Sequence, residues 1–428
     1  MNVSNNGVHH TMLDNGLTVL LKETHAAPVA TCWIWYRVGG RNETPGSTGI
    51  SHWTEHMMFK GTPAFPKGEI MRQVNKNGGV LNGFTSQDYT AYFETLPADR
   101  IELGLRIEAD RMANSVFDLD EVESERTVIL SERQGAENSP SFLLHEEVAA
   151  AAFRVHPYGH QVLGWKEDLR RIARDDLWRH YRTYYGPHNA VLVLVGDFEV
   201  PAMLELVKNR FGPIPAVSVP PPVNVIEPPQ RAERRVTVRE PGTTAYFQAV
   251  YHAPDARHLD YYPLLVLDAI LSGAKPMSLS SPSVTNKSAR LYRALVETEL
   301  ATFASSSFSD SLDPGLFSFS ATVRAGRSLE EVEVAMLAEI QRVTDEPVED
   351  AELAKTIKQS RAQFAYANES VSNQAYWLGR MEMIESYRRL YSFLDRLSAV
   401  TKEDVQRVAR TYLTPSNRTI GWFVPESQ

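Results

Sequence analysis

Two histidines and one glutamate lie within five residues of one another, at His52, Glu55 and His56. In a helix, residues four apart lie one above the other on the same face, so the two imidazoles can share a metal ion with Glu55 beside them. Neutral imidazoles bind zinc, zinc lowers the pKa of a bound water to about 7, and a neighbouring carboxylate can take a proton from that water. The spacing His-x-x-Glu-His is the inverted zinc-peptidase signature. A helix with two structural histidines fits the same five residues, so the segment alone leaves both interpretations open.

The sequence around the motif predicts one short helix that carries all three side chains. Ser47 or Thr48 can cap its start and Gly61 can end it. Between these limits an apolar face is supplied by Ile50, Trp53, Met57 and Met58.

Strands and longer helices are expected on both sides of this helix. Alternating or apolar runs predict strands at 17–21 and 29–36 before it and, as a hairpin, at 80–85 and 90–96 after it. Two helices follow, joined near Phe117-Asp118. The second is rich in carboxylates, and most of them are expected on a solvated face: Glu121, Glu123, Glu125 and Glu132.

Composition indicates an ordinary globular protein. The 428 residues are 43% hydrophobic and 10% aromatic, which is enough to bury a large core in two domains. The net charge of −9, without a Lys/Arg block, argues against nucleic-acid binding. No apolar run approaches the roughly 18 residues of a membrane span, and residues 1–7 show no secretory signal. We therefore expect a cytoplasmic location, or a periplasmic one if a leader precedes the recorded chain.

The second half of the chain repeats the first. Pairs of identical or similar residues are separated by a constant 228 positions and lead into an apolar strand in both halves: Leu169 and Leu397, Asp176 and Asp404, Arg182 and Arg410, Tyr184 and Tyr412, Pro187 and Pro415, Asn189 and Asn417. Such an offset favours duplication of an α+β unit. We predict a zinc-bearing domain at 1–215, a proline-rich linker at 216–232 and a homologous domain at 233–428. The second copy carries no His-x-x-Glu-His.

Several motifs together resemble the pitrilysin-like zinc metallopeptidases, close to the β subunit of the mitochondrial processing peptidase and its bacterial relatives. The resemblance covers nearly the whole chain and includes Leu13 to Leu17, the motif helix running into Phe59-Lys60-Gly61-Thr62, Gly78-Gly79 before Asn82, His156-Pro157-Tyr158 and the duplicated halves. It implies two α/β-sandwich domains, each a mainly antiparallel mixed sheet with helices packed on it.

The resemblance also assigns residues that spacing alone does not. It implies that Glu132, 76 residues after His56, is the third zinc ligand, and that Glu125, two helical turns earlier, supports the site. It implies that the strand after Gly-Gly is a sheet edge to which an extended peptide adds, at Asn82, Gly83 and Phe84. Without the resemblance, an ordinary hairpin strand is the interpretation for that segment.

One departure from the family predicts a partner. The family places an arginine and a tyrosine, seven apart, where they stabilise the attacked carbonyl as it becomes an oxyanion. The matching positions hold Val296 and Phe303, which donate no hydrogen bond. We therefore expect a heterodimer with a homologous chain that lacks the zinc motif and supplies the Arg/Tyr pair, unless Arg290, Tyr292 or Arg293 substitutes.

The expected function is zinc-dependent hydrolysis of peptides enclosed between domains, with Zn²⁺ bound by His52, His56 and Glu132 and with Glu55 as general base. The alternative is a non-catalytic structural subunit of the same fold. A serine or cysteine hydrolase is disfavoured, because the chain has no Gly-x-Ser-x-Gly and its only cysteine, Cys32, lies in an apolar strand.

Overall fold

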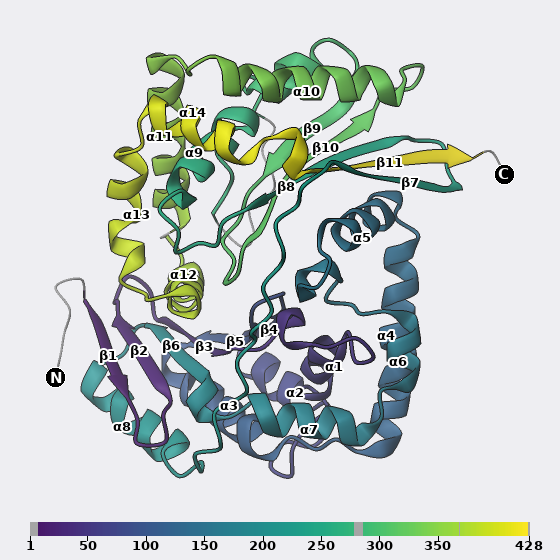
Figure 1. Ribbon diagram of the computed structural model, residues 1–428. Helices are drawn as coiled ribbons and strands as arrows, with labels where there is room; N and C mark the ends of the chain where they lie inside the picture. Colours follow the sequence, from purple (N-terminus) through teal and green to yellow (C-terminus); the bar gives the residue numbers. More distant parts are fainter. Residues whose placement is uncertain (1–6, 278–285, 368, 427–428) are drawn as a thin grey trace. The chain divides into compact units, whose positions relative to one another are not determined.

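The computed structural model describes residues 7–277, 286–367 and 369–426, which belong to two compact units (Figure 1). The described residues of the first unit are 7–134, 160–224 and 369–391. Those of the second are 135–159, 225–277, 286–367 and 392–426. Each unit is built on one mixed, mainly antiparallel sheet, so the α+β class predicted from the sequence is confirmed.

The sheet of the first unit contains the strands expected around the motif helix. Its order is β1 (Val8–Met12), β2 (Thr18–Glu23), β6 (Ala190–Gly196), β3 (Val29–Tyr36), β5 (Thr90–Pro97) and β4 (Val80–Thr85). The pair β2–β6 is parallel and the other pairs are antiparallel. The strand β4 therefore lies at one edge of the sheet.

Both faces of this sheet are covered, as the continuous apolar sequence of β3 requires. Trp33 and Trp35 lie against Tyr376 of α12 (Val371–Ile384), with ring centroids 5.9 and 5.7 Å from the tyrosine ring. On the opposite face Cys32 contacts Gly104 of α3 (Glu102–Asn114). The other helices of this unit are α1 (Ile50–Met57), α2 (Glu69–Lys76), most of α4 (Leu119–Glu137), α6 (Lys166–Arg171), α7 (Arg174–Tyr184) and α8 (Val200–Phe211).

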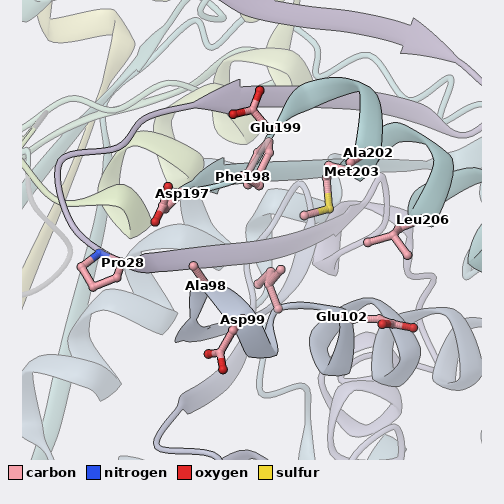
Figure 2. A pocket seen from close by; sticks show the side chains of 11 residues that line it. Pro28, Ala98, Asp99, Glu102, Asp197, Phe198, Glu199, Ala202, Met203 and Leu206 are labelled. Carbon is pink, nitrogen blue, oxygen red and sulfur yellow. The ribbon is translucent and has the colours of Figure 1, made fainter.

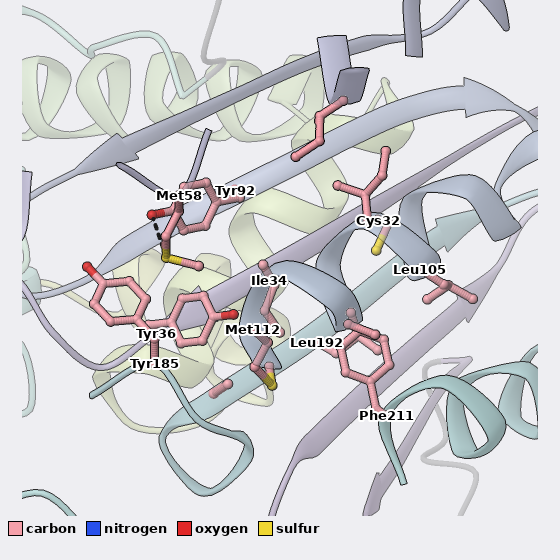
Figure 3. Packing of buried hydrophobic residues seen from close by; sticks show 14 of the residues in the cluster. Cys32, Ile34, Tyr36, Met58, Tyr92, Leu105, Met112, Tyr185, Leu192 and Phe211 are labelled. Carbon is pink, nitrogen blue, oxygen red and sulfur yellow. Dashed lines mark hydrogen bonds between the residues drawn. The ribbon is translucent and has the colours of Figure 1, made fainter. Parts of the chain in front are cut away.

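The core of the first unit also anchors the end of the motif helix. Met58, which follows α1, is fully buried among side chains of the sheet (Figure 3). The hydroxyl of Tyr92 on β5 donates a hydrogen bond of 3.2 Å to the Met58 sulfur. Burial of such side chains contributes about 1.5–3 kcal/mol each, so α1 is held by the same core that holds the sheet.

The second unit repeats the arrangement. Its sheet has the order β7 (Arg234–Pro241), β11 (Arg418–Glu426), β8 (Tyr246–Ala253), β10 (Gly315–Val323) and β9 (Ala301–Ser307), with β7 and β11 parallel. Its helices are α5 (Pro140–Ala152), α9 (Tyr261–Ser272), α10 (Leu329–Asp345), α11 (Asp350–Ala367), most of α13 (Arg389–Ser398) and α14 (Lys402–Tyr412). In strand order, β11, β8, β10 and β9 correspond to β6, β3, β5 and β4.

The units exchange one helix relative to the two halves of the sequence. The helix α12, from the second half, packs on the first sheet, where a Cβ at Gly379 would lie 2.1 Å from the Trp35 ring nitrogen. The helix α5, from the first half, packs on the second sheet, where a Cβ at Gly421 would lie 2.1 Å from Val148. The offset of 228 residues relates α5 to α12, so the exchange is reciprocal. The predicted boundaries at 215 and 233 separate the two duplicated halves of the sequence, and they stay a prediction. Residues 215–231, most of the predicted linker, form no helix or strand.

Among the residues that the structure describes, no helix combines the length and apolar character that a membrane crossing needs.

Candidate metal centre

The side chains of His52, His56 and Glu132 converge, so that one possible ligand atom of each lies close to those of the other two. Nε2 of His52 lies 3.8 Å and Nε2 of His56 lies 3.6 Å from Oε2 of Glu132, and one ligand atom from each residue lies within 4.8 Å of the others. Ligands at roughly 2.0–2.2 Å in tetrahedral directions are about 3.3–3.6 Å apart. The donor set and its spacing therefore fit a zinc ion, which these three residues would hold.

The start of α1 is capped differently from the prediction that Ser47 or Thr48 caps it. The residue before the helix is Gly49, with a φ of +86° that favours glycine, and it offers no side chain. The buried carboxylate of Glu43 accepts hydrogen bonds from the backbone nitrogens of Gly49 (2.8 Å) and Ser51 (2.9 Å). Thr48 instead donates to Asp168 at 2.7 Å. The expectation was wrong because a residue outside the helix satisfies its free N–H groups.

The same Glu43 connects α1 to a loop much later in the chain. Nε2 of His160 donates to Oε2 of Glu43 at 2.9 Å, and the carbonyl of His160 accepts from the side chain of Gln87 at 2.6 Å. In the second unit, His156 lies 3.1 Å from Asp313. Both histidines of this loop therefore have partners within the fold.

A repeating stripe of residues places α4 beside α1. Val122 and Ile129 are fully buried seven residues apart, and the guanidinium of Arg126 lies 4.7 Å from the centre of the Trp53 ring on α1. Glu125 and Glu132 lie three residues after Val122 and Ile129, respectively, on the same face of α4. The former is buried, whereas 43% of the Glu132 side chain is exposed. The carboxylates on the solvated side pair with neighbours: Glu121 with Lys67 and Glu123 with Arg126.

Glu125 holds His56 in a defined orientation. Nδ1 of His56 donates to Oε1 of Glu125 at 2.8 Å, which leaves Nε2 free to face a metal. The ammonium of Lys60 pairs with Oε2 of the same carboxylate. Burial raises the pKa of Glu125, but the hydrogen bonds from His56 and Lys60 outweigh it and leave that pKa lowered. Glu125 is therefore ionised and can accept the imidazole proton.

Burial also sets the protonation of the motif residues. The pKa of His52 is lowered to about 4 by burial and by the neighbouring His56, so His52 is neutral as a ligand must be. The pKa of His56 is raised: burial lowers it, but the bond to Glu125 and nearby carboxylates outweigh burial. The pKa of Glu55 is raised, chiefly by burial. A raised pKa brings a carboxylate closer to the range of an effective general base.

Glu55 and the edge strand are directly connected. The hydroxyl of Thr85, the last residue of β4, donates to Oε2 of Glu55 at 2.7 Å. On the same face of β4, a Cβ at Gly83 would lie 2.8 Å from the Tyr92 ring and 3.0 Å from the Phe59 ring. On the other face Phe84 packs near the Trp33 and Trp35 rings, with centroids 6.4 and 6.0 Å apart. The predicted substrate residues Asn82, Gly83 and Phe84 thus lie on an edge strand, and their role stays a prediction.

The predicted oxyanion positions lie in the second unit. Val296 ends a π-helical turn and Phe303 lies half exposed on the edge strand β9; both line a cavity of about 430 Å³. The guanidinium of Arg290 donates two hydrogen bonds to the carboxylate of Glu352, at 2.9 and 2.5 Å. Neither position gives this chain the Arg/Tyr pair.

One other group of possible metal ligands occurs among the described residues, at Glu23, His25 and Glu199. It is exposed, and both imidazole nitrogens of His25 already contact carboxylates: Asp197 at 2.6 Å and Glu23 at 3.0 Å. Asp197 and Glu199 line a cavity of about 580 Å³ together with apolar side chains that include Phe198 and Met203 (Figure 2). Hydrogen bonds from the His25 ring to two carboxylates, which raise the pKa of His25, account for this group without a metal.

Comparison with known proteins gives the family. A model described as insulinase (peptidase family M16) matches residues 18–166, and one described as the peptidase M16 inactive domain matches residues 171–360. The chain belongs to the M16 peptidase family. The first M16 model spans His52, Glu55, His56 and Glu132, and the second begins after them.

Relatives match over nearly the whole chain. The mitochondrial-processing peptidase subunit beta of Blastocladiella emersonii is 28% identical over 406 residues, which are 94% of this chain and 85% of that protein. The zinc protease PqqE of Helicobacter pylori is 28% identical over 422 residues, 96% of this chain and 92% of that protein. A solved protease from Helicobacter pylori has a TM-score of 0.92 and 27% identity, covering 98% of this chain and 99% of that one. The resemblance to the pitrilysin-like metallopeptidases, which are the M16 family, and the duplicated fold were predicted from the sequence and are confirmed.

Sequence reasoning missed Glu43, Lys60 and Thr85. Lys60 lies in a segment that the M16 resemblance includes, and alternation along β4 places Thr85 on the same face as Gly83. No spacing rule identifies Glu43, because it caps a helix that it does not belong to.

Proposed function

We propose that this M16 protein is a zinc-dependent endopeptidase in which His52, His56 and Glu132 hold the ion and Glu55 is the general base. The observation that carries the proposal is the convergence of the three ligand atoms within 4.8 Å beside a buried carboxylate. Zinc supplies Lewis acidity, which lowers the pKa of a bound water to about 7 and polarises a peptide carbonyl.

The chain's own groups account for the proton transfers. The Glu55 carboxylate, whose pKa is raised by burial, takes a proton from the attacking water and later gives it to the leaving amine. Glu125 keeps the Nδ1 proton of His56 in place, so that Nε2 stays available as a ligand. Lys60 neutralises Glu125 from its other oxygen.

Peptide substrates are proposed to bind as an added strand on β4. This strand is at the sheet edge and ends at Thr85, whose hydroxyl contacts Glu55. Main-chain hydrogen bonds to an unpaired edge hold peptides of varied sequence, while adjoining side chains select among them. A peptide on β4 would therefore pass close to the general base.

We further propose that the active assembly contains a second, homologous chain. Val296 and Phe303 leave the M16 oxyanion positions without hydrogen-bond donors, and Arg290 is occupied by Glu352. The relative from Blastocladiella emersonii is by name one subunit of its enzyme. The proposed partner lacks the zinc motif and carries an arginine and a tyrosine seven residues apart.

The test measures peptide cleavage and zinc content together, for the chain alone and mixed with its homologous partner. Wild type is expected to bind one zinc per chain and to cleave peptides when the partner is present. Glu55→Gln should retain the zinc and lose about 10²- to 10⁴-fold in kcat, because the base is removed while the ligands stay. Glu132→Gln is the contrasting variant, which should lose the zinc itself.

Two results would contradict these proposals. Full activity of the lone chain would exclude the need for a partner. Zinc-loaded wild type that cleaves no peptide in either form would exclude the peptidase and favour the alternative, a structural subunit of the same fold.

A further inference from the structure

Thr85 is the point where the edge strand meets the general base. Its hydroxyl donates to Oε2 of Glu55 at 2.7 Å, and this is the one side-chain hydrogen bond that the described residues supply to that carboxylate. Glu55 is only 7% exposed, so water does not readily replace the bond. The other carboxylate oxygen, Oε1, is thereby left to act on a substrate water.

The position of Thr85 is itself well determined. It pairs with Thr90 in the register of β4 and β5, and the Thr90 hydroxyl lies 3.3 Å from the Thr85 hydroxyl. The Thr90 hydroxyl also lies 2.9 Å from the carbonyl of Val38, two residues after β3. The pairing of β4 with β5 therefore fixes the position of the Thr85 hydroxyl. This hydroxyl in turn orients the Glu55 carboxylate through one hydrogen bond.

We propose that Thr85 is a positioning residue that fixes the carboxylate of Glu55 for proton transfer, so that catalysis depends on the placement of β4. This inference rests on the proposed peptidase function. The peptide is also proposed to add to β4. Thr85 therefore connects the proposed peptide-binding strand with Glu55, the proposed base. Losing the bond should impair the chemical step and leave both zinc binding and peptide binding intact.

The experiment compares three variants in the zinc-loaded protein with its partner chain present. Thr85→Val removes the hydroxyl and keeps the shape, Thr85→Ser keeps the hydroxyl, and Thr31→Val is the matched control. Thr31 is a buried threonine of β3 in the same sheet, whose hydroxyl bonds the Glu94 carbonyl at 3.0 Å.

For Thr85→Val we expect kcat to fall about 10- to 100-fold, the range for one hydrogen bond to a charged group, with KM and zinc content unchanged. Thr85→Ser should restore kcat to within about threefold of wild type, and Thr31→Val should not lower it. A Thr85→Val variant with wild-type kcat would overturn the proposal. So would a variant in which KM and kcat change together with loss of zinc.

A second readout does not depend on activity. Crystal structures of wild type and Thr85→Val should show the Glu55 carboxylate rotated away from its wild-type orientation in the variant. An unmoved carboxylate overturns the positioning role alone. Absence of peptide cleavage by zinc-loaded wild type, with and without the partner, overturns the proposed function instead, so the two failures are distinguishable.

Discussion

Nδ1 of His56 and Oε1 of Glu125 lie 2.8 Å apart, and the second oxygen of Glu125 is paired with Lys60. This arrangement makes the orientation of the His56 imidazole, one of the proposed zinc ligands, depend on a carboxylate seven residues before Glu132, the proposed third ligand. Partners of this kind typically contribute 10- to 100-fold to metal affinity.

Glu125→Gln should therefore weaken zinc binding by about 10- to 100-fold, measured by competition with a chelator of known affinity. Glu123→Gln is the matched control, since Glu123 lies on the same helix, is half exposed and pairs with Arg126. Equal zinc affinity in both variants would show that the His56 orientation does not need Glu125.

The cap on α1 predicts a stability effect from Glu43, a residue outside the helix. Glu43→Ala leaves the backbone nitrogens of Gly49 and Ser51 and the ring of His160 without their acceptor. The free energy of unfolding should fall by about 2–4 kcal/mol, because buried donors are left unsatisfied. Glu205→Ala, at an exposed carboxylate of α8, should change it by less than about 0.5 kcal/mol in the same denaturant titration. A similar small loss in both would argue against a structural cap at Glu43.

Two helical glycines should respond oppositely to alanine. Gly379→Ala places a Cβ 2.1 Å from the buried Trp35 ring, so it should destabilise the protein by about 1–3 kcal/mol or more despite alanine's better helix propensity. A Cβ at Gly135 in α4 meets no atom within 4 Å, so Gly135→Ala should stabilise by up to about 0.5–1 kcal/mol. Thermal unfolding of the two variants checks the prediction, and a Gly379→Ala variant as stable as wild type would contradict the close packing of α12.

His180 should make stability depend on pH. Burial lowers the pKa of His180 to about 3 from an ordinary value of 6.5, and Nε2 lies 3.3 Å from the Ser51 hydroxyl. Between these pH values the unfolded chain binds a proton that the folded chain does not, so stability is complete above pH 6.5 and falls as the pH decreases below it. From pH 7.5 to 5.5 this one residue should cost about 1 kcal/mol. His180→Gln should reduce the fall by that amount in denaturant titrations at the two pH values; an unchanged fall would assign the pH dependence to other groups.

The part of the site that the sequence predicts is the part that one helix encodes. His52, Glu55 and His56 have fixed spacing on one face of α1, so their proximity follows from helix geometry. Glu132 is 76 residues away from His56, and only the family resemblance selects it among the carboxylates of α4.

Other features depend on the tertiary fold. Glu43 caps a helix from outside, and Thr85 reaches Glu55 only because β4 lies beside α1. The predicted cap at Ser47 or Thr48 was wrong because the Glu43 carboxylate, six residues before Gly49 and outside the helix, accepts the hydrogen bonds instead. The duplication predicted two similar sheets. The constant offset shows which residues of the two halves are equivalent, but it does not show on which sheet a helix packs.

The exchange of α5 and α12 sets the order in which the chain can fold during synthesis. Trp33 and Trp35 are made early, yet the helix that covers them is translated only after all of the second sheet except its last strand. That face of the first sheet therefore stays uncovered by α12 until residues 371–384 have been synthesised. Native packing on that face of the first sheet therefore waits for residues 371–384, even though the motif helix is among the first segments to emerge.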